Sequence, residues 1–183
     1  MQWWIILIIV VAVLVLYVIA TYNKLVKARN KVRDQWAQID VQLKRRYDLI
    51  PNIVETVKGY AKHEKEALEA VISARSKALS ATTPEDEMKA DGDVSRALSK
   101  LLALTESYPE LKANENFLKL QDSLSETEDK IAYSRQFYND NAKSYRNLVE
   151  MFPSNIVAKL FRFEAMPFFE ASAAEKEAPK VQF

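Results

Sequence analysis

The sequence predicts an all-α protein in which an N-terminal transmembrane helix continues into an antiparallel bundle of four long helices. Three observations support this fold class. An uncharged apolar run precedes Lys24, apolar residues recur every three or four positions in the rest of the chain, and only two of the 183 residues are glycine. Because glycine supplies the positive φ angles of tight hairpin turns, so few glycines disfavour a β-sheet protein.

The first expected element is a membrane-spanning helix within residues 1–23. Thirteen of the fifteen residues from 5 to 19 are Ile, Leu or Val, and together they favour insertion by about 4 to 8 kcal/mol. A helix over residues 3–22 would be about 30 Å long, which matches a hydrocarbon core. Aromatic residues suited to the two interfaces mark its ends, namely Trp3, Trp4, Tyr17 and Tyr22.

Two other structures compete with a retained span. A cleaved signal peptide would need a basic beginning and a shorter apolar core, whereas Met1 and Gln2 carry no charged side chain. A buried core helix would be amphipathic, whereas this run is apolar on every face. The pattern therefore favours a span that stays in the membrane.

The charges after the span predict its orientation. Five cations and no acid occupy residues 24–33, namely Lys24, Lys27, Arg29, Lys31 and Arg33. By the positive-inside rule, the N-terminus then faces outward and the remaining chain lies in the cytoplasm. A solvated helix face would carry the same cations, so both interpretations stay open.

Residues 24–152 are expected to form the bundle. The spacing of apolar residues predicts helices at about 24–58, 64–80, 85–107 and 114–151. Each residue of an α-helix adds about 1.5 Å of length. If the four helices run alternately away from the membrane and toward it, their lengths nearly cancel and the chain returns to the membrane. A rival arrangement, with residues 24–80 as one arm of a long hairpin, also closes but leaves more apolar surface uncovered.

Prolines and capping residues mark the expected helix ends. Pro51 predicts a kink in the first helix. Thr83 and Asn114 are placed to cap the third and fourth helices, and Pro109 and Pro153 to end them. Three polar residues lie on the seam of the fourth helix, namely Thr127, Ser134 and Asn141. They are interpreted as residues that fix the register between helices or that contact a neighbouring molecule.

Composition argues against most chemistry. The chain has no cysteine, one histidine and a net charge of +1, which excludes thiolate metal sites and disfavours nucleic acid as a partner. A di-iron bundle would need a second histidine, and a serine hydrolase would need a nucleophile and an orienting acid beside His63, for which the sequence shows no supporting pattern. We therefore expect no catalytic residue, no cofactor and no metal site.

One charged cluster precedes Pro51. It contains Arg45, Arg46 and Asp48, and its expected partners on the fourth helix are Glu126 and Glu128. An ion pair between helices would fix their register more than it would add stability. A binding spot for an anion is the alternative.

The segment 153–169 is aromatic and amphipathic, and a flexible tail is expected at 170–183. The segment and its flank supply a candidate interface, namely Phe152, Ile156, Leu160, Phe161, Phe163, Phe168 and Phe169. It either folds back to cap the bundle or meets the membrane surface or another subunit. A charge at Leu160 or Phe163 is expected to break assembly while the bundle stays folded.

Three motifs of the chain are distinctive: residues 36–52 with a continuation at 57–64, residues 132–139, and residues 152–158. They resemble the LemA family of bacterial membrane-anchored helical proteins. The resemblance implies a short outer N-terminus, one span of the bacterial inner membrane and an antiparallel helical bundle. It implies no reaction.

The sequence thus favours a non-enzymatic membrane scaffold whose partners are the lipid bilayer and further copies of itself. Self-association is expected through the span, the seam of the fourth helix and the aromatic segment. The alternative is an adaptor for a single envelope partner, and family associations suggest a membrane metallopeptidase or a stress protein. An enzyme ranks third.

Overall fold

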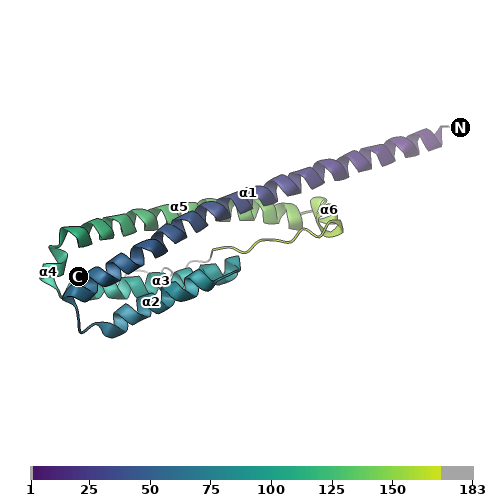
Figure 1. The fold of residues 1–183 in the computed structure, drawn as a ribbon. Coiled ribbons are helices and arrows are strands. Elements are labelled where there is room, and N and C mark those ends of the chain that lie inside the picture. The colour runs from purple at the N-terminus through teal and green to yellow at the C-terminus, as the bar shows by residue number, and fades with distance from the viewer. Residues whose placement is uncertain (1, 170–183) are drawn as a thin grey trace, which may run out of the picture. The chain divides into compact units, whose positions relative to one another are not determined.

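A computed structural model describes residues 2–169, and all regular structure in this range is helical (Figure 1). The predicted all-α class is thereby confirmed, while the expected tail at 170–183 lies outside the described residues. The helices are α1 (Trp3–Tyr60), α2 (Lys65–Ser80), α3 (Pro84–Thr105), α4 (Pro109–Lys112), α5 (Glu115–Glu150) and α6 (Ser154–Leu160). The described residues form two compact units: unit 1 contains residues 2–38 and 136–168, and unit 2 contains residues 39–135 with Phe169.

Helix α1 is one continuous helix of 58 residues, and Pro51 lies inside it. A proline in a helix interior removes a backbone hydrogen bond and costs about 3 kcal/mol. Ile50, Ile53 and Val54 surround the proline and are all buried. Burial of these three apolar side chains offsets that cost, because each contributes roughly 1.5 to 3 kcal/mol.

Unit 2 begins with the end of α1 and the return of the chain in α2. Tyr60 ends α1, and Lys65 starts α2 after a short turn. Arg75 Nε of α2 donates a hydrogen bond to the Tyr47 carbonyl of α1 over 2.7 Å, so α2 folds back along α1. The chain therefore reverses between residues 60 and 65, and the single arm over residues 24–80 is not formed.

Side-chain caps hold the next helix starts. The Thr83 Oγ1 accepts a hydrogen bond from the Asp86 amide over 3.2 Å at the start of α3. Asn114 Oδ1 accepts two, from the amides of Asn116 and Phe117 over 2.9 and 3.0 Å, at the start of α5. These bonds satisfy amide groups that a helix N-terminus otherwise leaves without partners, so both predicted caps are present.

Helix α4 is a short element that was not predicted from the sequence. It begins at Pro109, which was expected only to end the preceding helix. Helix α3 stops earlier, at Thr105, whose hydroxyl donates to the Leu102 carbonyl over 2.6 Å. Proline suits the first position of a helix because its missing amide proton is not needed there.

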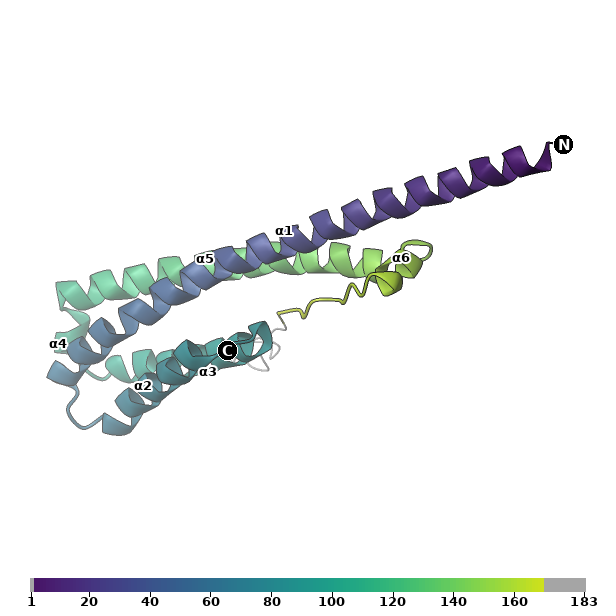
Figure 2. The ribbon, with the colours of Figure 1, turned by 45° about the vertical axis from the view of Figure 1, so that its right-hand side comes forward.

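Unit 1 packs α6 beside α1 and the end of α5 (Figure 2). Its core contains side chains from all three helices and from the chain just after α6, namely Leu25, Val32, Ala142, Tyr145, Val157, Ala158 and Phe163. Arg162 has a φ of 54°, and the amides of Arg162 and Phe163 donate to the carbonyls of Lys159 and Ala158. This pattern ends α6 with a left-handed residue and turns Phe163 back into the core.

Candidate functional site

The largest buried charged side chain among the described residues is Arg46 in unit 2. Only 1% of this side chain is exposed. On α3, its Nη1 donates to Asp91 Oδ1 over 2.6 Å and its Nη2 to Ser95 Oγ over 2.8 Å. On α5, Glu128 Oε1 lies 2.8 Å from Nε as an ion pair. One arginine of α1 therefore contacts two other helices.

Asp91 of α3 links the same helices, because it contacts arginines of both α1 and α5. Its carboxylate is fully buried and accepts from both Arg46 and Arg135, the latter on α5. Arg46, Asp91, Glu128 and Arg135 thus contribute two positive and two negative charges. We call these four residues with Ser95 the ion cluster. Its balanced charge is what a buried polar network requires.

Burial also changes the protonation equilibria beside the ion cluster. Desolvation lowers the pKa of Arg46, while the Glu128 carboxylate opposes that shift. Burial raises the pKa of the neighbouring Tyr47 to about 12. Arginine stays charged and this tyrosine stays neutral near pH 7, so neither side chain can exchange a proton in that range. The arrangement fits a device that holds three helices in register.

The charged residues predicted from the sequence differ in burial and in partners. Arg46 lies against Glu128 as described, and Arg45 Nη2 lies 3.4 Å from Glu126 Oε2 at the surface. Asp48 is exposed and lines a shallow depression with Lys44 and Tyr47. Because the carboxylates of the ion cluster already balance Arg46, the structure does not offer this guanidinium to an external anion.

Asp91, Ser95 and Arg135 were not among the site residues predicted from the sequence. A signal for Asp91 was present, because it shares its spacing with buried residues of α3, namely Val94, Leu98, Leu101 and Thr105. An acid at such a position requires a buried cation. Arg46 has the same kind of position on α1, between Leu43 and Ile50. The two spacing patterns, compared with each other, would have suggested the pair.

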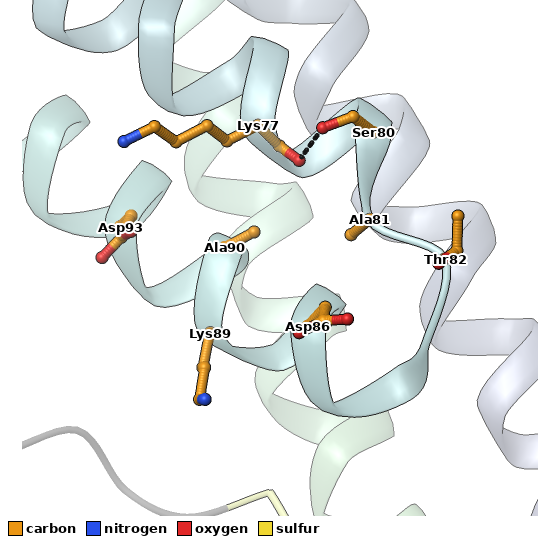
Figure 3. A pocket seen from close by; sticks show the side chains of 8 residues that line it. All are labelled: Lys77, Ser80, Ala81, Thr82, Asp86, Lys89, Ala90 and Asp93. Atoms are coloured by element: carbon orange, nitrogen blue, oxygen red, sulfur yellow. Dashed lines mark hydrogen bonds between the residues drawn. The ribbon is translucent and has the colours of Figure 1, made fainter.

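No group of three or more His, Cys, Asp or Glu residues that could hold a metal ion occurs within residues 2–169. His63 is exposed in the turn between α1 and α2. The depression at the turn between α2 and α3 is open, and Lys77, Lys89 and Asp93 are among the residues that line it (Figure 3). Its internal hydrogen bond runs from Ser80 Oγ to the Lys77 carbonyl over 2.9 Å. This surface lacks the buried base or nucleophile of a catalytic cleft.

The three polar residues on the seam of α5 differ in burial. Thr127 is fully buried, and its hydroxyl donates to the Ser123 carbonyl one turn earlier over 2.7 Å. Asn141 Nδ2 does the same with the Phe137 carbonyl over 2.7 Å. Ser134 is half-buried. Thr127 and Asn141 thus bond to their own helix, and the apolar part of the seam fills the cores of the two units.

The aromatic segment meets the end of the span in unit 1. The Tyr22 ring lies edge-on to Phe161 and Phe163, with centroids 4.8 and 5.6 Å away. The Arg29 guanidinium lies 5.1 Å from the centre of the Phe163 ring. These contacts tie residues 161–163 to the part of α1 that follows the apolar run.

Pro167 and Phe168 lie against the rest of unit 1. The Tyr138 hydroxyl donates to the Pro167 carbonyl over 2.9 Å, and Trp36 lies edge-on to Tyr138 with ring centroids 5.5 Å apart. The Arg146 guanidinium lies 5.2 Å from the Phe168 ring. In unit 2, the Arg135 guanidinium lies 5.0 Å from the centre of the Phe169 ring.

The candidate interface therefore consists of two groups. Phe163 is buried, and Phe168 and Phe169 are half-buried. Phe152, Ile156, Leu160 and Phe161 are exposed. The expectation that the bundle stays folded with a charge at position 163 is therefore corrected. A charge at this buried ring would disturb folding as well as assembly. Leu160 is exposed, so a charge there still tests assembly separately from folding.

One helix among the described residues, α1, is long and apolar enough to cross a membrane. Trp3 is 73% exposed and Ile19 is 52% exposed, although both belong to the most apolar part of the chain. Burial on α1 begins at Thr21 and Leu25. The uncovered apolar surface thus coincides with the predicted span.

Comparison with known proteins adds a family and named relatives. The model of the LemA family matches residues 35–183. The chain is 28% identical over 158 residues to Protein LemA of Metamycoplasma hominis. This match covers 84% of this chain and 71% of that protein. It is 25% identical over 179 residues to Magnetosome protein MamQ 2 of Paramagnetospirillum magneticum, and 23% identical over 179 residues to Magnetosome protein MamQ of Magnetospirillum gryphiswaldense. Each magnetosome match covers 84% of this chain and 66% of the relative.

Proposed function

Because this chain belongs to the LemA family, we propose that it is a membrane-anchored helical scaffold that assembles with further copies of itself. The family and the magnetosome relatives are compatible with membrane association. The proposal includes antiparallel packing of the four long helices and a non-enzymatic role.

The observation that carries the proposal is the continuity of α1 within unit 1. The helix has no break between its exposed apolar part and the part that packs on α5 and α6. A tether would place a flexible linker between anchor and folded domain. A helix without one transmits the position of the membrane directly to unit 1, which is the property that a scaffold needs.

Self-association is supported by the surface that the chain itself leaves uncovered. Helices associate in a bilayer through van der Waals packing, and the side chains of the span are available for it. We expect the full-length protein, extracted in mild detergent and measured by light scattering, to form a closed particle of many copies. A monomer or a small dimer would refute the assembly and favour an adaptor for one envelope partner, such as a membrane metallopeptidase or stress protein.

The proposed orientation places the N-terminus outside and the helical units in the cytoplasm of a bacterial cell, with the span in the inner membrane. Because the chain has no cysteine, single thiols report topology without background. A membrane-impermeant thiol reagent added to spheroplasts is expected to label Gln2→Cys and leave Val41→Cys unlabelled. Lysis should expose the second thiol, and the opposite labelling pattern would reverse the orientation.

A further inference from the structure

Unit 1 exposes an apolar patch beside α6. Its members are 47 to 78% exposed, namely Met151, Phe152, Ile156, Leu160 and Phe161. We call these five residues the outer patch. They belong to the turn between α5 and α6 and to α6 with its C-cap.

Helix α6 is apolar on two faces. Val157 and Ala158 are buried in the core of unit 1, whereas Ile156 and Leu160, four residues apart, share a face that is exposed. A surface helix in water normally presents polar side chains outward. Exposed large apolar side chains gathered on one short segment mark a contact with something other than water.

The outer patch is joined to the span. Phe161 contacts the Tyr22 ring at 4.8 Å, and Tyr22 lies at the end of the apolar run. Tyrosine is enriched at the level of the lipid headgroups. Once the span is inserted, this contact therefore places the outer patch at the same level of the bilayer.

The charges around the patch identify the lipid surface more closely. Lys24 and Lys27 of α1 are exposed, as are Lys159 and Arg162 at the end of α6. On the acidic side, Glu150 is paired with Arg146 over 2.8 Å, and Glu164 follows Phe163. Exposed cations thus outnumber acids here, as anionic headgroups require.

We propose that the outer patch inserts into the headgroup boundary of an anionic bilayer, so that α6 is a second, interfacial anchor beside the span. The inference rests on the proposed membrane anchoring and does not depend on self-association. The bilayer covers Ile156 and Leu160, and Lys159 and Arg162 meet the headgroups.

The test attaches an environment-sensitive fluorophore to Leu160→Cys in the full chain, reconstituted into vesicles of equal parts phosphatidylcholine and phosphatidylglycerol. Leu79→Cys is the matched control, since Leu79 is an exposed leucine of α2 in unit 2. A nitroxide lipid labelled near the glycerol end of its acyl chain is expected to quench the probe at 160 and spare the probe at 79. Vesicles of phosphatidylcholine alone should lower the ratio of inserted to uninserted probe about fivefold for each cation that meets the surface.

Equal quenching at both positions, in protein that still floats with the vesicles, would overturn the interfacial anchor and leave the membrane anchoring intact. Loss of flotation would count against the anchoring itself. A probe at 160 that is shielded from aqueous iodide but not quenched by the nitroxide lipid would show that a second copy covers the patch, which also overturns the proposal.

Discussion

Replacing Arg46 with methionine is expected to lower the free energy of unfolding by about 3 to 5 kcal/mol, because the change leaves Asp91 and Glu128 with too little positive charge. Arg46 is 1% exposed, and both of its carboxylate partners lie within 3 Å of its nitrogens. The measurement is urea denaturation of the full chain in detergent micelles, followed by helical circular dichroism.

Arg45→Met is the matched control, because it removes the same side chain one position earlier. Its pair with Glu126 is exposed and 3.4 Å long, so its loss should lower the free energy of unfolding far less than the loss of Arg46. Equal effects of the two substitutions would contradict the structural role of the ion cluster.

Adding Asp91→Leu to Arg46→Met is expected to restore part of the stability. The double variant leaves one acid, Glu128, and one cation, Arg135, so no unbalanced charge remains buried. A double-mutant cycle should give a coupling energy of about 0.5 to 3 kcal/mol between positions 46 and 91. Additive losses would mean that the two side chains act independently.

Placing lysine at both Val10 and Leu14 is expected to abolish stable membrane insertion. Each lysine at the centre of a span costs about 2.5 to 3.5 kcal/mol, so the pair cancels the 4 to 8 kcal/mol that the apolar residues contribute. The measurement is the fraction of protein that remains in membranes after extraction with alkaline carbonate.

Val41→Lys combined with Ile72→Lys supplies the control for two added charges. Val41 and Ile72 are 62% and 51% exposed on α1 and α2 of unit 2, so the lysines remain in water and the protein should stay in the membrane fraction. If the Val10 and Leu14 variant also stays there, the apolar run is not what anchors the chain.

Much of the fold was predictable because its causes are local. A helix start needs only an acceptor side chain and the amides two or three residues later, which is why Thr83 and Asn114 could be identified. The family was predictable from long motifs, and the match of the family model over residues 35–183 confirms it. Helix α4 was missed because Pro109 suits either the end of one helix or the beginning of the next.

The partners of the charged residues were less predictable, because they are distant in sequence. Asp91 is 45 residues from Arg46, and Arg135 is 44 residues from Asp91. Helical spacing states which residues share a face, but not which faces of different helices meet. Glu128 was a predicted partner, whereas Asp91 required the packing of α3 to be known.

By itself, the sequence determined that the chain is helical, that its apolar N-terminal run is long enough to span a bilayer, and that it resembles one family. Hydrophobicity and residue spacing along one segment are sufficient for these conclusions. Only the tertiary structure decided that the chain reverses after Tyr60, that Arg46 meets Asp91, and that Phe163 is buried while Leu160 is exposed. Burial depends on which other helices lie against a residue, and that arrangement is a property of the folded chain as a whole.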